Sequence, residues 1–221
     1  MDKKIYHGSS RIVRPPKFGS GNQYNDFGLG FYCSETPQHA AEWAVRSGRN
    51  GFVSGYSINT DGLRIINLCG PQYSPLHWIS LLLSFREFDM FQPSARSARE
   101  YINRYYSVDH QGIDCIIGYR ADNSCFMFVQ DFLDGRLSYQ SLRQALTGDP
   151  ANRQFVLKSN RAFDRISFTG YETALAAEYY PAGASREFRM LSSILSRRES
   201  SGLYITQMTE EDIKPYDLRL Q

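Results

Sequence analysis

Apolar positions along the chain recur with two different periods. Alternating or short continuous apolar runs predict β-strands. They occur at residues 5–9, 52–58, 63–68, 113–119, 154–157, 166–168 and 203–205, with a further aromatic strand ending at Cys33. Spacings of three and four residues predict helices. They occur after Pro37 and at residues 75–90, 94–106, 123–133, 138–146 and 186–198, with a polar helix from Thr209. Because these elements mix without a regular βαβ rhythm, we expect an α+β fold.

Loop signals and one helix face refine this pattern. Residues 14–25 are rich in proline and glycine and predict a loop. The helix after Pro37 places three alanines and Trp43 on one face. We therefore expect Trp43, like Trp78, to lie in the core.

The composition is that of an ordinary globular chain. The 221 residues are 42% apolar and 22% charged. The net charge of +2 is too small to indicate nucleic-acid binding by itself. A candidate linker at residues 169–170 divides the chain into an expected domain of residues 1–169 and a helical C-terminal extension of residues 170–221.

The sequence carries no obvious membrane, export or metal signal. The longest apolar run, near Trp78, is too short to span a bilayer, so we expect no membrane contact. No apolar stretch of a secretory signal follows the N-terminus. We expect a cytoplasmic protein with reduced thiols, or one delivered to a host cell by a route without such a signal. The four cysteines form no C-x-x-C pair, so we expect no metal site.

Three segments carry residues suited to nucleotide binding. They are Tyr-His-Gly-Ser at residues 6–9, Asp-Phe-Gly-Leu-Gly-Phe-Tyr at residues 26–32 and Asn-Arg-Gln-Phe at residues 152–155. Each alone is weak. Asp-Phe-Gly occurs without the rest of the protein-kinase signature set. Gly28-x-Gly30 lacks the third glycine of a dinucleotide-binding fingerprint.

Taken in order, the three segments resemble the ADP-ribosyltransferase superfamily. The likeness is to its histidine–tyrosine–glutamate branch, which includes diphtheria toxin and the poly-ADP-ribose polymerases, and most closely to an uncharacterised bacterial branch. It covers residues 5–168 and is most specific at residues 26–32 with the later Trp43-Ala44. The resemblance implies a split β-sheet core with surrounding helices, and NAD+ bound in a cleft between two small sheets.

The resemblance also implies roles for particular residues. His7 would bind the adenosine-side ribose, and the Gly8 backbone would hold the nicotinamide amide, since glycine allows close approach. Tyr32 would stack on the nicotinamide ring, sharing one pocket with His7. The guanidinium of Arg86 suits a phosphate. Further residues expected in the NAD+-binding region are Ser9, Asp26, Phe27, Gly28, Gly30 and Phe31.

The chain departs from the family at the glutamate position, which Gln154 occupies. An amide can hold a ribose hydroxyl but supplies no negative charge. Because stabilisation of a developing cation is often a large catalytic term, another carboxylate is needed or positioning must suffice. Asp122 is the first alternative catalytic residue and Asp26 the second. The change also argues against polymer synthesis.

From the resemblance we expect transfer of ADP-ribose from NAD+ to a macromolecular acceptor, a protein or a nucleic acid. A bacterial toxin or effector with an antitoxin partner fits this activity. Three alternatives stay open: an NAD+ glycohydrolase, a catalytically inactive module that binds NAD+ or ADP-ribose, and an interaction protein without a nucleotide site. The arginines of residues 186–198 either contact a partner or belong to a lid over the core.

Overall fold

The computed structural model describes residues 2–121, 123–148, 152–195 and 202–220. The chain forms two compact units, each assembled from separate segments. Unit 1 comprises Met1–Asn67, His110–Gly118 and Arg153–Phe188. Unit 2 comprises Leu68–Asp109, Tyr119–Asn152 and Arg189–Gln221.

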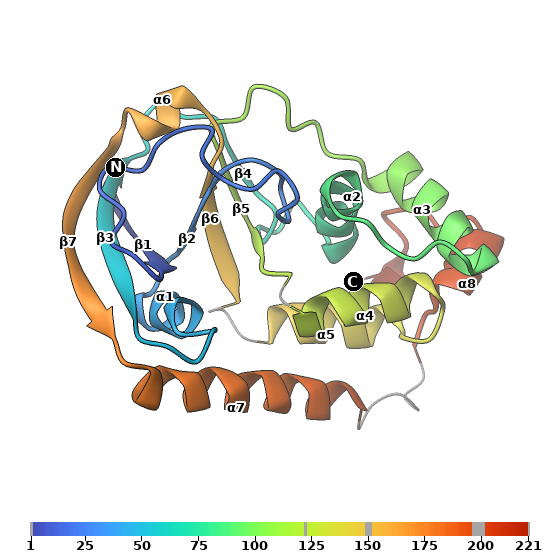
Figure 1. Ribbon diagram of the computed structural model, residues 1–221. Helices are drawn as coiled ribbons and strands as arrows, with labels where there is room; N and C mark the ends of the chain where they lie inside the picture. Colours follow the sequence, from blue (N-terminus) through green and yellow to red (C-terminus); the bar gives the residue numbers. More distant parts are fainter. Residues whose placement is uncertain (1, 122, 149–151, 196–201, 221) are drawn as a thin grey trace. The chain divides into compact units, whose positions relative to one another are not determined.

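The sheet has seven strands in the order β4-β5-β6-β2-β1-β3-β7 (Figure 1). The strands are β1 (Asp2–Ser9), β2 (Phe31–Ser34), β3 (Gly51–Asn59), β4 (Ile65–Asn67), β5 (Cys115–Tyr119), β6 (Arg153–Leu157) and β7 (Ile166–Ala174). Strands β2, β1, β3 and β7 pair antiparallel in turn, and β4 pairs parallel with β5. We expected two small sheets. The strands form one sheet instead, because β6 lies between β2 and β5 and joins the two groups.

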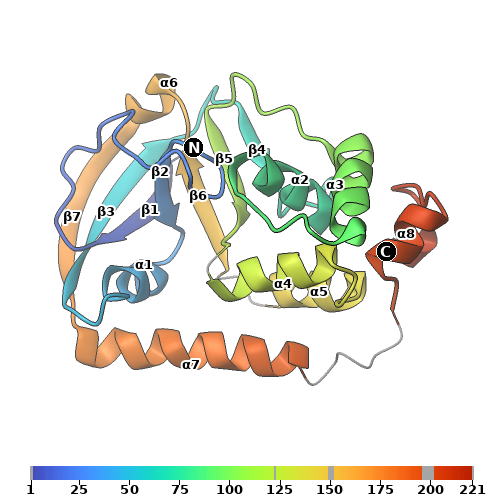
Figure 2. The same cartoon turned by 45° about the vertical axis from the view of Figure 1, so that its right-hand side comes forward.

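Helices complete an α+β fold, which confirms the expected class. The helices are α1 (Pro37–Ala44), α2 (Pro75–Phe85), α3 (Pro93–Tyr106), α4 (Asn123–Leu133), α5 (Tyr139–Thr147), α6 (Asn160–Phe163), α7 (Ala176–Leu195) and α8 (Ile205–Glu210). Helix α1 lies against β1 in both views, and α4 runs beside α5 (Figures 1 and 2). In the described part of the chain, no helix is long and apolar enough to cross a bilayer.

The two faces of the sheet bury different residues. One face packs on the alanines of α1 and includes Val53 and the partly buried Tyr6. The opposite face carries a larger core, with Ile5, Phe31 and Tyr56 among its members. Since successive side chains of a strand point to opposite faces, strand register decides which face each motif residue occupies.

Several expected boundaries and one core residue need correction. The expected domain boundary at residues 169–170 falls inside β7, which continues to Ala174 because it pairs with β3 along its length. The indole of Trp78 is fully buried, as expected, and donates to the Tyr119 carbonyl over 3.0 Å. The expectation for Trp43 is wrong: this residue is 44% exposed and packs under the Arg46 guanidinium at 4.7 Å.

The expected strand at residues 203–205 is also wrong. Tyr204 makes one isolated bridge to Ser138, and helix α8 then begins at Ile205. This helix ends at Glu210, so the polar helix expected from Thr209 begins earlier and is short. The helix expected at residues 75–90 ends at Phe85.

Candidate active site

The three motif segments meet on neighbouring strands of unit 1. His7 lies on β1, Tyr32 on β2 and Gln154 on β6, and these strands are adjacent in the order β6-β2-β1. Ser34 of β2 pairs with Tyr6 on one side and with Gln154 on the other. Segments more than 100 residues apart in sequence are thus brought to one part of the sheet.

The 26–30 turn that leads into β2 is closed by the Tyr32 side chain. The Tyr32 hydroxyl accepts a hydrogen bond from the Phe27 amide over 2.9 Å and donates one to the Gly28 carbonyl over 2.7 Å. Gly28 has a φ of 68°, a left-handed conformation that glycine adopts without strain, and its amide donates to the Asn25 carbonyl over 2.8 Å. The tyrosine therefore fixes the turn through its hydroxyl group.

Lys158 provides a second attachment of this turn from the end of β6. Its ammonium group donates to the Phe27 carbonyl and, over 2.6 Å, to the Leu29 carbonyl. Burial lowers the pKa of Lys158 to about 8. Sequence reasoning missed this residue, because a single lysine after a strand resembles any surface lysine until its distant partners are known.

Asp26 and Gln154 form a buried pair. The Gln154 amide nitrogen donates to an Asp26 carboxylate oxygen over 3.0 Å. Asp26 is 8% exposed and Gln154 is 7% exposed, so a carboxylate lies beside the glutamine in a water-poor environment. Asp26 was the second carboxylate expected from the sequence; Asp122, the first, lies outside the described residues.

His7 links β1 to β2 through its ring. Its Nδ1 lies 2.8 Å from the Tyr32 carbonyl oxygen, and since a carbonyl only accepts, we assign a proton to Nδ1. Burial lowers the pKa of His7 below its usual value, although the bond to Tyr32 opposes this shift. The imidazole is therefore neutral at pH 7, and its Nε2 carries a lone pair that can accept a hydrogen bond.

The expected pocket lined by the rings of both His7 and Tyr32 is wrong. The His7 ring packs on Phe31, with ring centroids 4.5 Å apart, on the face of the larger core. Tyr32 follows Phe31 in β2 and so points to the other face, as do Ser34 and its partner Gln154. The register of β1 with β2 separates the two rings, although a hydrogen bond joins their residues.

Gly8, Gly30 and Ser9 make structural contacts in unit 1. A side chain at Gly8 would meet the Ala40 carbonyl oxygen at 1.8 Å, so this glycine allows α1 to approach β1. A side chain at Gly30 would meet Val156 at 2.7 Å. The Ser9 hydroxyl donates to the Arg11 carbonyl over 2.5 Å.

Two further predicted residues make aromatic contacts within their own units. Phe27 is fully buried, and its ring occupies the space that a side chain at Gly118 would fill. Arg86 belongs to unit 2, where its guanidinium lies 5.0 Å from the Phe126 ring. The contact that the structure shows for Arg86 is thus with an aromatic ring of its own unit, and its predicted role at a phosphate stays a prediction.

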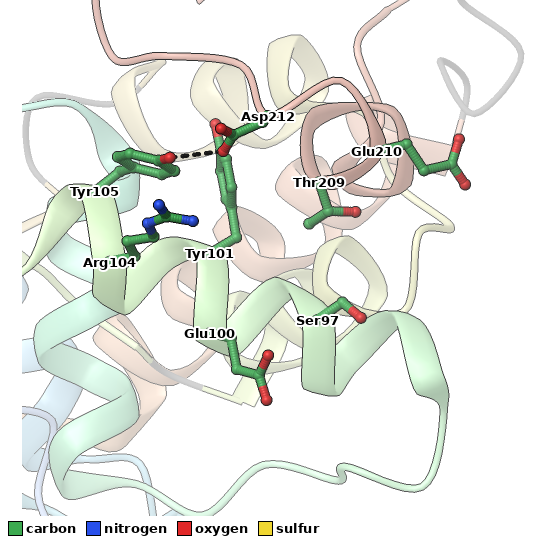
Figure 3. A pocket seen from close by; sticks show the side chains of 8 residues that line it. All are labelled: Ser97, Glu100, Tyr101, Arg104, Tyr105, Thr209, Glu210 and Asp212. Carbon is green, nitrogen blue, oxygen red and sulfur yellow. Dashed lines mark hydrogen bonds between the residues drawn. The ribbon is translucent and has the colours of Figure 1, made fainter.

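Unit 2 holds a pocket of about 420 Å³ between α3 and the end of α8 (Figure 3). Asp212, which follows α8, has a φ of 48°. Its carboxylate accepts from the Tyr105 hydroxyl over 2.6 Å and from Lys214. The lining of this pocket includes none of the residues that the sequence predicts for NAD+ binding or catalysis. The contacts of Asp212 hold the chain after α8 against α3. Because the three motif segments meet in unit 1, we take that cluster as the candidate active site.

Unit 1 thus defines an α+β protein whose histidine, tyrosine and glutamine segments converge on three neighbouring strands. Residues 3–168 match the family model described as "Protein of unknown function (DUF3990)". This match covers more than half of the chain, and the chain belongs to that family. The chain matches none of the curated proteins and none of the solved structures with which it was compared.

Proposed function

We propose that this protein cleaves NAD+ and transfers its ADP-ribose to a macromolecular acceptor, a protein or a nucleic acid. The observation that carries the proposal is the buried bond between Asp26 and Gln154. The resemblance to ADP-ribosyltransferases requires a carboxylate at the position of Gln154. Asp26 supplies that missing negative charge from the neighbouring turn.

The chemistry divides between these two side chains. As the bond between the ribose C1′ and the nicotinamide nitrogen breaks, its electron pair leaves with nicotinamide, and positive charge grows on the ribose. The Gln154 side-chain oxygen accepts a hydrogen bond from the ribose 2′-hydroxyl, while the Asp26 carboxylate favours the growing cation. An acceptor nucleophile then bonds to C1′ and releases its proton to solvent.

The other motif residues hold the strands and the turn. The His7 ring lies on the opposite face of the sheet from Gln154, so it joins β1 to β2 through its bond to the Tyr32 carbonyl and does not take the ribose-binding role that the resemblance implies. Tyr32 acts through its hydroxyl, which fixes the turn that carries Asp26. This differs from the stacking role that the family likeness implies.

We extend the proposal to a cytoplasmic toxin or effector that an antitoxin protein neutralises.

Labelled NAD+ tests the proposal. Purified protein is incubated with NAD+ labelled in its adenylate part, together with total cell protein and total RNA, and nicotinamide release is measured. Label retained on protein or RNA indicates transfer, and free ADP-ribose alone indicates a glycohydrolase. Ligand binding without nicotinamide release indicates an inactive module. No binding at all would contradict a nucleotide site.

Two variants with a matched control tie the activity to this pair. Asp26→Asn removes the charge while keeping the shape, and Gln154→Ala removes the amide, so both lower nicotinamide release. Gln154→Ala lowers turnover more than NAD+ binding. Asp164→Asn alters an exposed aspartate of the same unit and leaves the rate unchanged. Equal rates in Asp26→Asn and the wild type would remove the carboxylate from the mechanism.

A further inference from the structure

We infer that Lys158 is a positioning residue of this site, whose ammonium group holds the 26–30 turn in the conformation that binds NAD+. The choice of NAD+ as the ligand rests on the proposed function. The hold of Lys158 on the turn rests on the contacts of its side chain. The Lys158 side chain reaches the Phe27 and Leu29 carbonyls, one on each side of Gly28. No motif in the sequence assigns this role.

Two carbonyls that point toward the same place create a negative region, and a cation there stabilises both. A side chain at Gly30 would meet Lys158 Cδ at 3.3 Å, so the lysine stem passes directly over this glycine. The Lys158 backbone is anchored as well, since its amide donates to the Asp114 carbonyl over 2.8 Å. The ammonium group therefore reaches the turn from a fixed base.

The turn is consequently attached by three side chains, one from β2, one from β6 and one from the residue that follows β6. Tyr32 of β2 binds the Phe27 amide and the Gly28 carbonyl. Gln154 binds the Asp26 carboxylate, and Lys158 binds the carbonyls on either side of Gly28. Of these attachments, that of Lys158 alone depends on a positive charge. Removal of this charge would weaken the hold on the Phe27 and Leu29 carbonyls and leave the other two attachments in place.

Charged and titratable groups on the adjoining elements set the response to pH. Asp26 lies on the turn and is bonded to Gln154. Asp114, before β5, accepts from the Ser159 hydroxyl over 2.5 Å, and its pKa is lowered by hydrogen bonds, which outweigh the opposing effect of burial. Tyr32 lies on β2, and its hydroxyl is bonded to the turn.

On β1, burial lowers the pKa of His7, so its ring is neutral at pH 7 and above. Asp114 is already ionised well below neutral pH. Of these two groups and Lys158, only Lys158, with a pKa of about 8, changes charge between pH 7 and pH 9.5.

Calorimetric titration with NAD+ at pH 7 and pH 9.5 tests the inference. We expect wild-type affinity to fall about tenfold between these values, and Lys158→Arg, which stays charged, to keep its affinity. Lys158→Met should bind about tenfold more weakly than the wild type at pH 7 and equally at pH 9.5. Lys17→Met, an exposed lysine in the same unit, serves as the control.

Unchanged affinity in Lys158→Met at pH 7, or a wild-type affinity that is flat with pH, would overturn the inference. Hydrogen exchange of the Gly28 amide gives a readout without ligand, since this amide is bonded to Asn25 within the turn region. Faster exchange in Lys158→Met supports the hold on the turn, and equal exchange contradicts it. If the wild type binds no NAD+ while exchange still responds, the proposed function fails and the hold on the turn stands.

Discussion

Replacing Gln154 by glutamate is expected to destabilise the protein in a pH-dependent way. In the wild type the Gln154 amide nitrogen donates to Asp26 over 3.0 Å. A glutamate would place a second carboxylate there, with no proton to share when both are ionised. The substitution restores the residue that the family likeness calls for, yet we expect it not to raise activity.

The magnitude follows from the geometry. Two carboxylates with charge centres about 4 Å apart repel by about 4 kcal/mol at an effective dielectric constant of about 20. A repulsion of that size raises the pKa of one carboxyl group by about 3 units, so the pair shares a proton near pH 7. The folded protein then binds more protons than the unfolded chain above about pH 4.3. Its free energy of unfolding therefore falls as pH rises through this window.

Urea unfolding at pH 5 and pH 8 measures the effect. Gln154→Glu should lose about 4 kcal/mol of stability relative to the wild type at pH 8, and most of that loss should vanish at pH 5. The double variant Asp26→Asn/Gln154→Glu exchanges the two groups and should regain stability at pH 8. A Gln154→Glu protein as stable as the wild type at both values, or more active, would refute the pairing.

Three further substitutions test the surrounding structure. Tyr32→Phe removes both hydroxyl bonds to the 26–30 turn, so we expect a loss of about 1–2 kcal/mol in urea unfolding and faster exchange of the Phe27 amide. Gly8→Ala should cost about 3 kcal/mol in the same assay, because its new methyl group would meet the Ala40 carbonyl; a stable variant would contradict the packing of α1. Because burial lowers the folded-state pKa of His7, wild-type stability should fall as pH drops below 6.5, and His7→Asn, which keeps a donor near Nδ1, should show a smaller fall.

Local patterns predicted most elements but not the relation between them. The apolar runs located β1 and β3, and the helical spacing located α3 almost to the residue. The face that Tyr32 occupies depends on how β1 registers with β2, and a shift of one residue reverses it. No local pattern in this sequence fixes that register, so the expected pocket shared with His7 could not be tested before the structure was known.

Individual errors have similarly local causes. On α1 the buried positions are His39, Ala40, Ala41 and Ala44, and the indole of Trp43 remains partly exposed. Tyr204 and Ile205 suit a strand by composition, but Tyr204 caps α8 instead. Asp26 was weighed as the missing carboxylate on chemistry alone; its contact with Gln154 joins residues that the sequence separates by 128 positions.

A structure of the protein with a non-cleavable NAD+ analogue tests the central claim most directly. The account predicts that a hydroxyl of the nicotinamide-side ribose lies about 2.7–3.2 Å from the Gln154 side-chain oxygen, with the Asp26–Gln154 bond intact. An analogue bound elsewhere on the protein, or a ribose that contacts neither side chain, would contradict it.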